Sequence, residues 1–388
     1  MVKSAILGKL AEFLEGPYKR LEEQKGTYGK QVIGYFVPGV PAELIHASGL
    51  LPVALLGSSK PIFKADAHLT QSTCSLVRSN LEMALDGHLD FLDGVVLTHT
   101  CECIRSAALS WYDIFPTPFF DVVMLPKKLN GSPVVRERFM EELSRFKTSL
   151  EDFVGQKILD DRLKESIYLY NQGREALRRL YDISRNFPQL VTSRDVFTAI
   201  KSSMLMPKEE HNRLLYQLLS ELESKEAFAT PSDRGTKLIL DGHVVEPLSL
   251  LDLIEEAGGY VVGDNIATGF RCIAEDIRLD GDPLEAILDQ HLACPPFSGY
   301  YDPRVDRGQF LLDLVEKNHA SGVIFLILYQ CDPYVYDYPD LKKVLNKAGI
   351  SNLMIQTELS TTSLAQIRTR LQAFMEIIIA GGIFAGAE

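Results

Sequence analysis

Six cysteines carry the most distinctive chemistry in this sequence, and three of them stand beside predicted strands or helices. Cys101 and Cys331 each follow an apolar run of strand type, and Cys74 precedes a helix that begins near Ser75. In open α/β sheets, the carboxyl ends of the strands border the crevice in which ligands bind. The amides at a helix N-terminus favour a thiolate. We therefore expect these three thiols to face one cleft.

Three thiolates at one cleft would match a [4Fe-4S] cluster that keeps one iron open to a substrate oxygen or another small ligand. A tetrahedral zinc site is a second interpretation. The third is that each cysteine is a small buried apolar residue, and we keep it for Cys103, Cys272 and Cys294. Spacing alone does not choose among the three. Six cysteines are too few for a disulfide framework in 388 residues, and a reducing compartment would keep them as thiols.

The elements that must position these thiols alternate along the first part of the chain. Apolar, β-rich runs occupy 30–38, 51–57, 92–100 and 119–126, and segments with helical spacing lie at 41–48, 75–85 and 101–115. Strands joined by helical crossovers indicate a mostly parallel sheet with helices on both faces.

A helical period of about 3.6 residues then replaces the alternation from Val134 to about Ser224. The segment Ala227–Gly235 carries the Pro, Ser and Gly of a linker. After it, we expect strands at 237–245, 260–266, 322–330 and 352–359, and helices at 248–257, 283–292, 309–319, 341–348 and 364–379.

The predicted fold class is therefore α/β, with two doubly wound, mostly parallel sheet domains and a helical segment between them. We place the N-terminal α/β domain, with Cys74 and Cys101, at residues 1–133. The helical middle region covers 134–230, and the C-terminal α/β domain, with Cys331, covers 231–388.

Composition argues against two classes of partner. Lys and Arg total 40 against 52 Asp and Glu, and the net charge of −12 removes any global argument for nucleic-acid binding. The apolar run 377–387 is about half of the roughly 20 residues that a membrane-spanning helix needs. Charged residues also interrupt the apolar residues near the N-terminus, unlike a secretory signal. We expect a cytoplasmic protein that binds neither nucleic acid nor membrane.

Several catalytic motifs are missing from the sequence. No G-x-G-x-x-G or G-x-x-x-x-G-K-[ST] motif follows a predicted strand, so a partner must supply the site if nucleotide energy is used. The sequence gives no support for a zinc peptidase or a serine hydrolase either, because it contains neither H-E-x-x-H nor G-x-S-x-G.

Six separated segments form a recognisable series. They are YFVPGVPAELIHASGLLPV at 35–53, QSTCSLVR at 71–78, DGVVLTHTCECIR at 93–105, GDNIATGFR at 263–271, SGVIFLILYQCDPYVYDYP at 321–339 and QIRTRLQAFME at 366–376. In this order they resemble the large subunits of the 2-hydroxyacyl-CoA dehydratase and benzoyl-CoA reductase family. The resemblance runs from about residue 30 to the end of the chain and is least distinctive in the middle helical region.

The resemblance implies a [4Fe-4S] cluster held by three cysteines. Matched by motif, they are Cys74 before an arginine-containing helix, Cys101 in a T-C-[DE] turn and Cys331 in a C-D-P turn. The family turn often has another residue type at the position of Cys103. Some relatives, the double-cubane proteins, bind a larger cluster with additional cysteines, so a double-cubane cluster reductase stays an alternative.

The resemblance also implies partners and a reaction class. The chain would form a heterodimer with a homologous cluster-bearing subunit, and single electrons would reach it from separate ATP-hydrolysing iron–sulfur activator or electron-donor subunits. The substrate is an acyl-CoA thioester. Dehydratases reduce its carbonyl to a ketyl radical and expel a hydroxyl group, whereas benzoyl-CoA reductases add electrons and protons to the aromatic ring.

For catalytic proton handling we look first at Glu43 and His46, which are three residues apart and so share one helix face. A solvated helix-start carboxylate and a structural histidine are the alternative interpretations. His99 ranks lower, and Glu102 could tune a neighbouring cluster through its charge.

The leading prediction is an iron–sulfur subunit of an ATP-coupled benzoyl-CoA reductase, because 263–271 and QCDPYVYDYP look more like the smaller of its two substrate-binding subunits. A subunit of a 2-hydroxyacyl-CoA dehydratase is the closest alternative. A non-catalytic, metal-stabilised scaffold is the alternative from a different class.

Overall fold

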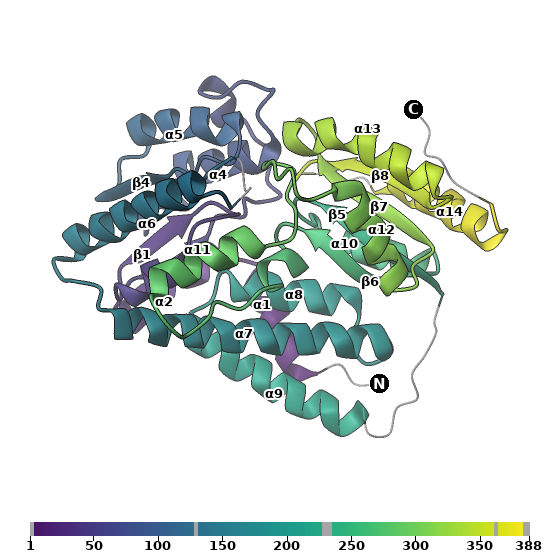
Figure 1. Ribbon diagram of the computed structural model, residues 1–388, viewed down its shortest axis with the longest axis horizontal. Helices are drawn as coiled ribbons and strands as arrows, with labels where there is room; N and C mark the ends of the chain where they lie inside the picture. The colour runs from purple at the N-terminus through teal and green to yellow at the C-terminus, as the bar shows by residue number, and fades with distance from the viewer. Residues whose placement is uncertain (1–3, 128–130, 227–234, 361–363, 383–388) are drawn as a thin grey trace.

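The computed structural model describes residues 4–127, 131–226, 235–360 and 364–382, and it contains two parallel four-stranded sheets. The first has the order β2-β1-β3-β4 and the second the order β6-β5-β7-β8. Their strands are β1 (Val32–Tyr35), β2 (Leu51–Ala54), β3 (Gly94–Thr98), β4 (Phe119–Val123), β5 (Thr236–Gly242), β6 (Gly259–Ile266), β7 (Gly322–Leu328) and β8 (Ser351–Thr357). In Figure 1 the first sheet lies on the left and the second on the right.

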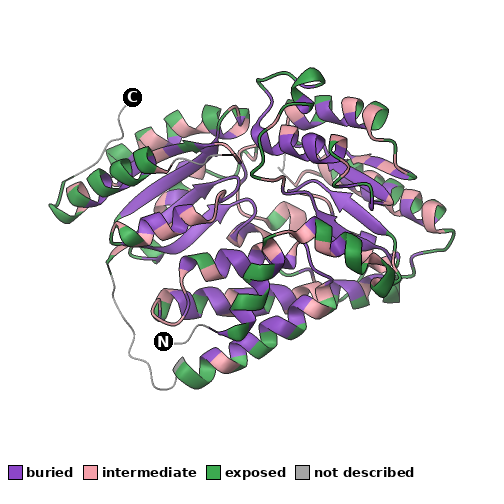
Figure 2. Cartoon of the chain, turned by 180° about the vertical axis from the view of Figure 1, so that it is seen from behind, coloured by how far each residue is buried: buried purple, intermediate pink, exposed green. Residues whose placement is uncertain are grey.

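Strand composition explains why both sheets are parallel and covered. Every residue of β1, β2, β3, β6 and β7 is buried, as expected for apolar strands that helices cover on both faces. Figure 2 shows the buried strands inside and the exposed residues on the outer sides of the helices. The predicted α/β fold class is confirmed.

Helices connect and cover these strands. Those beside the first sheet are α3 (Ala42–Ala47), α4 (Ser75–Leu85) and α5 (Glu102–Ile114), with a short 3₁₀ turn at Ala65–Ala67. Those that follow β5 are α10 (Ser249–Glu256), α11 (Pro283–Ala293), α12 (Arg307–Lys317), α13 (Asp332–Lys347) and α14 (Ala365–Ile379), with a 3₁₀ turn at Phe270–Cys272. The predicted helix at 341–348 in fact begins at Asp332: Pro333 lies in its first turn, where a missing N–H costs nothing, and the helix continues through Pro339.

In the sequence, four helices separate the strands of the first sheet from those of the second. They are α6 (Pro133–Val154), α7 (Asp160–Asn186), α8 (Ser193–Ser203) and α9 (Lys208–Glu226). Figure 1 shows α7 and α9 below both sheets. The N-terminal helices α1 (Ala5–Leu14) and α2 (Pro17–Tyr28) precede the first strand. α1 packs on α8 and α9, and Ser4 Oγ donates to Glu221 Oε2 at 2.6 Å.

The domain boundaries at 133/134 and 230/231 stay predictions. The predicted linker Ala227–Gly235 lies, apart from Gly235, outside the described residues. Ion pairs cross both predicted boundaries: Arg174 of α7 pairs with Glu43 of α3, and Arg136 of α6 pairs with Asp289 of α11 at 2.7 Å.

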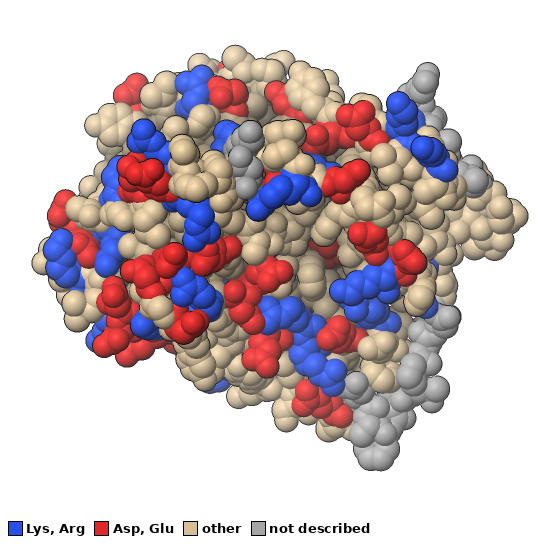
Figure 3. Space-filling view, in the orientation of Figure 1, with Lys and Arg blue, Asp and Glu red and all other residues tan. Residues whose placement is uncertain are grey.

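Two features of the described helices and surface bear on the predicted partners. Among the residues that the structure covers, no helix has both the length and the apolarity to cross a membrane. On the face seen in Figure 3, basic and acidic side chains are mixed and form no continuous basic surface. The absence of a nucleic-acid partner stays a prediction.

Candidate functional site

Cys101 and Cys331 occupy equivalent positions in the two sheets. In the first sheet β3 lies beside β1, on the side opposite to β2. In the second sheet β7 lies beside β5, on the side opposite to β6. The strand order therefore reverses between β1 and β3, and between β5 and β7, which are the points where α/β sheets open a binding crevice. Cys101 follows β3 and Cys331 follows β7.

Each of the three predicted thiols begins a helix. Cys74 is the N-cap residue of α4, Cys101 of α5 and Cys331 of α13. Figure 1 shows α5 and α13 above the two sheets, on the side opposite to α7 and α9. Three helix N-termini thus direct partial positive charge at the thiols, which favours the thiolate form of cysteine.

The three thiols also act on one another. A hydrogen bond between Cys331 and Cys74 lowers the pKa of Cys74 and raises the pKa of Cys331. The charge of Cys101 acts on Cys331 as well, and the charge of Cys74 acts on Cys101. The two halves of the chain meet here, because the Leu359 amide after β8 donates to Ser75 Oγ at 3.2 Å. We call Cys74, Cys101 and Cys331 the thiol group.

The thiol group differs from a site for a single metal ion. Among the described residues, no three His, Cys, Asp or Glu side chains are arranged to hold one metal ion. The ligands of a single zinc ion must all reach one atom, whereas a cubane takes one thiolate on each of several irons.

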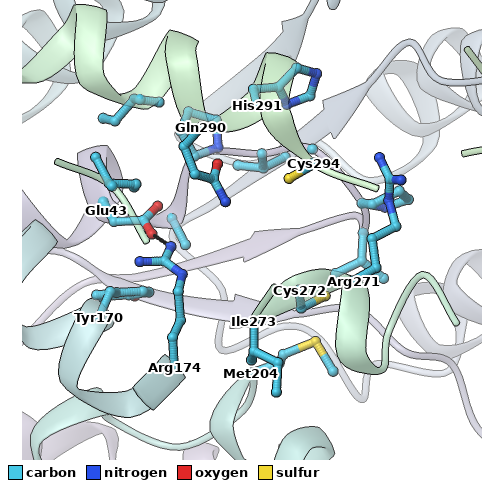
Figure 4. Close-up of a pocket in the computed structure, with 18 of the residues that line it drawn as sticks. Glu43, Tyr170, Arg174, Met204, Arg271, Cys272, Ile273, Gln290, His291 and Cys294 are labelled. Atoms are coloured by element: carbon cyan, nitrogen blue, oxygen red, sulfur yellow. Dashed lines mark hydrogen bonds and ion pairs between the residues drawn. The ribbon is translucent and has the colours of Figure 1, made fainter. Parts of the chain in front are cut away.

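A cavity of about 180 Å³ lies where the loop after β1, helices α6, α7 and α11, and the segment after β6 come together. Figure 4 shows its polar lining. Buried Glu43 forms an ion pair with Arg174 of α7, which also donates to Asn171 Oδ1 at 2.8 Å. The apolar wall contains Phe139, Leu143, Leu177, Ile273, Ile277 and Ile287.

The charge of the lining is mostly positive. The lining contains Arg174, Lys208 and Arg271 but a single carboxylate, that of Glu43. Arg271 is buried, lies 4.9 Å over the Phe297 ring and donates to the Pro295 carbonyl. Each of the three cations already has a partner in the protein, and the excess of positive charge that remains suits a ligand that carries oxygen atoms.

Tyr300 links the cavity to the thiol group. Its side chain lines the cavity, and its buried hydroxyl has no hydrogen-bond partner among the described residues. Burial raises the pKa of Tyr300, and the charge of Cys101 acts in the same direction. The hydroxyl therefore keeps its proton and is free to donate it in a hydrogen bond to a ligand.

Comparison with known proteins decides the family. The family model described as "2-hydroxyglutaryl-CoA dehydratase, D-component" matches residues 39–378, which is most of the chain. The chain belongs to this family. The resemblance predicted from the sequence motifs is confirmed, and the chain is an enzyme subunit of the dehydratase or benzoyl-CoA reductase type.

Three relatives of this dehydratase family cover nearly the whole chain. The beta subunit of (R)-phenyllactyl-CoA dehydratase from Clostridium sporogenes is 29% identical and covers 95% of this chain and 97% of its own length. The beta subunit of lactoyl-CoA dehydratase from Anaerotignum propionicum is 28% identical, with 96% and 99% covered. A subunit of benzoyl-CoA reductase from Thauera aromatica is 29% identical, with 90% and 91% covered.

Glu43 and His46, predicted to share one helix face, have different surroundings in this family member. Glu43 lines the cavity, but His46 does not. His46 Nδ1 lies 3.0 Å from Ser166 Oγ, and Nε2 lies 3.2 Å from Glu209 Oε1, so packing against α7 and α9 occupies both ring nitrogens. A catalytic role for either residue stays a prediction.

The remaining sequence candidates lie near the thiol group. His99 Nε2 is 3.3 Å from Glu102 Oε1, and Arg105 pairs with the other oxygen of Glu102 at 2.6 Å.

Cys103, Cys272 and Cys294, interpreted as buried apolar residues, are instead only partly buried. Cys272 and Cys294 line the cavity.

Sequence reasoning missed the cationic residues of the cavity. Arg174 and Lys208 lie in the helical region, where charged residues usually face solvent. Arg174 follows the same spacing as the buried residues Ile167, Leu177 and Tyr181 of α7. An arginine within an apolar stripe was therefore a signal of a buried, paired charge.

Lys208 allows a test of the cavity's electrostatics. Burial lowers the pKa of Lys208 to about 8, and the charge of Arg174 acts in the same direction. Between about pH 8 and the ordinary lysine pKa of 10.5, the unfolded chain holds a proton that the folded chain has lost. The free energy of unfolding of the wild type should therefore rise through this window relative to Lys208→Met. Urea unfolding of both proteins across this range measures the difference, and a pH-independent difference would contradict it.

Proposed function

We propose that this chain is the iron–sulfur subunit of an ATP-coupled benzoyl-CoA reductase, and that Cys74, Cys101 and Cys331 hold its [4Fe-4S] cluster. The observation that carries the proposal is the meeting of three cysteine-capped helix N-termini from both halves of the chain. Such amides stabilise the thiolates that iron requires. When bound, the cluster supplies a path for single low-potential electrons.

The proposed partners follow from what the chain lacks and from its relatives. Its sequence contains no phosphate-binding glycine motif, so ATP hydrolysis is assigned to a separate iron–sulfur activator. The relatives are described as subunits, which supports a hetero-oligomer with a homologous cluster-bearing subunit. A reducing cytoplasm would keep the thiols ready for metal binding.

The cavity is the proposed place of the acyl group of the thioester. Its volume of about 180 Å³ is below the roughly 300–1,000 Å³ of pockets for drug-sized ligands, so it suits an acyl group without the nucleotide part of CoA. The apolar wall from α6, α7 and α11 would exclude water around an aromatic ring. The Tyr300 hydroxyl would donate a hydrogen bond to an acyl oxygen, and Arg271 would orient that group.

A second candidate function is dehydration of a 2-hydroxyacyl-CoA. The observation that favours it is the excess of cations in the lining, because Lys208 and Arg271 suit an oxygen-bearing acyl chain better than a phenyl ring. The relatives from Clostridium sporogenes and Anaerotignum propionicum are dehydratase subunits.

The deciding experiment uses the chain in complex with its partner subunits, purified without oxygen. The complex is supplied with ATP, a low-potential reductant and either benzoyl-CoA or a 2-hydroxyacyl-CoA such as lactoyl-CoA. ATP-dependent consumption of benzoyl-CoA supports the proposal, whereas turnover of only the hydroxyacyl ester moves the chain to the second candidate.

Metal analysis of the same preparation tests the remaining alternatives. After the iron and sulfide of the separately purified partner subunits are subtracted, about four irons and four sulfides are expected for a single cubane in this chain. About twice that remainder would indicate a double-cubane cluster. Zinc without iron and sulfide would indicate a metal-stabilised scaffold and would overturn the proposal.

A further inference from the structure

Cys103 is the second residue of α5 and lies beside the thiol group. Its Sγ is 3.9 Å from the carbonyl oxygen of Ser72, two residues before Cys74. Its side chain also forms a hydrogen bond with Cys101. Asp332, which follows Cys331, is close enough for its charge to act on Cys103. Cys103 therefore lies beside Cys74 and Cys101, and close to Asp332, the residue that follows Cys331.

The other two additional cysteines are placed differently. Cys272 Sγ donates to the Ala267 carbonyl at 2.9 Å, and both Cys272 and Cys294 line the cavity. Of the three additional cysteines, all of which lie in described parts of the chain, only Cys103 is placed to join the thiol group. Its contact with the Ser72 carbonyl is long and therefore weak, so the backbone does not fix the thiol in its present place.

We propose that Cys103 supplies a fourth thiolate to the cluster held by Cys74, Cys101 and Cys331, so that no iron in this subunit stays open. This inference rests on the proposed function and deepens it. Four thiolates complete the usual ligand set of a [4Fe-4S] cluster. A capped cluster binds no substrate oxygen, so this chain would pass electrons through space, past Tyr300, to an acyl group in the cavity.

The added thiolate has a second physical consequence. A fourth negative ligand increases the net negative charge of the cluster and lowers its reduction potential. Removing it by Cys103→Ala should shift the potential upward, and Cys103→Ser, which retains an oxygen ligand, should shift it less. Spectroscopic redox titration of the complex measures both shifts. A merely structural role for Cys103 would leave the potential unchanged.

The sharper test uses the lability of an uncapped iron. The full-length chain, reconstituted anaerobically with iron and sulfide in the absence of its partner subunits, is treated with ferricyanide, and the conversion of a four-iron to a three-iron cluster is followed by electron paramagnetic resonance and iron analysis. The wild type should keep about four irons per cluster, whereas Cys103→Ala should fall to about three. Cys272→Ala, the same replacement at a cavity cysteine, should behave as the wild type does. Equal conversion of the wild type and Cys103→Ala would overturn the proposal.

A measurement on the wild type alone guards against a variant that fails to fold. In the same reconstituted chain, cyanide would bind an open iron and change the paramagnetic resonance spectrum, so an unchanged spectrum supports the capped cluster and a changed one overturns it. The proposed function and the proposed role of Cys103 can be overturned by different results. A chain without iron and sulfide overturns the proposed function, whereas a chain with about four irons that converts readily overturns only the role of Cys103.

Discussion

Replacement of Cys331 by alanine is expected to remove about four irons and four sulfides from the anaerobically purified complex, so that only the clusters of the partner subunits remain. Cys331 is the thiol that α13 brings from the second sheet to Cys74 of the first. Without it, only ligands from the first half of the chain remain. Iron and acid-labile sulfide analysis, with paramagnetic resonance of the reduced protein, measures the loss.

The matched control for this prediction is Cys294→Ala. Cys294 is also a cysteine of the second half of the chain, but it is only partly buried, lines the cavity and lies outside the thiol group. The control should keep the iron and sulfide of the wild type. Full retention of iron by Cys331→Ala, with an unchanged circular dichroism spectrum, would remove Cys331 from the proposed ligands.

Replacement of Arg174 by methionine is expected to lower the free energy of unfolding by about 3–5 kcal/mol. Arg174 and Glu43 form a buried ion pair between α7 and α3, with 10% and 6% of their side chains exposed. The replacement leaves the Glu43 carboxylate buried without its counter-charge, and its desolvation is then no longer offset. Urea unfolding followed by circular dichroism measures the change.

Two further variants distinguish the effect of breaking a buried ion pair from the effect of removing any positive charge. Arg368→Met removes the arginine of an exposed pair with Glu256, in which 50% and 51% of the side chains are exposed, and should cost less than about 1 kcal/mol. Adding Glu43→Gln to Arg174→Met removes the unpaired charge and should restore part of the lost stability. Equal effects of Arg174→Met and Arg368→Met would contradict the buried-pair interpretation.

Local sequence pattern was sufficient for the fold class and for most elements. Continuous apolar runs predicted the strands, because a strand covered on both faces has no polar side, and the helical period predicted α6 to α9. The same runs placed Cys101 and Cys331 at carboxyl ends of strands. The early start of α13 was missed because proline usually interrupts a helix: Pro333 is harmless in the first turn, but Pro339 lies inside the helix, just before the predicted start at 341.

The site depended on contacts that no local pattern contains. Glu43 and Arg174 are 131 residues apart in sequence, and nothing near either residue identifies the other as its partner. Spacing correctly placed Glu43 and His46 on one helix. In the packed structure Glu43 lines the cavity, whereas His46 contacts Ser166 and Glu209. Periodicity reports which face of one segment is buried. Which side chains meet across two sheets is decided by how the sheets and helices pack together, and only the tertiary structure contains that information.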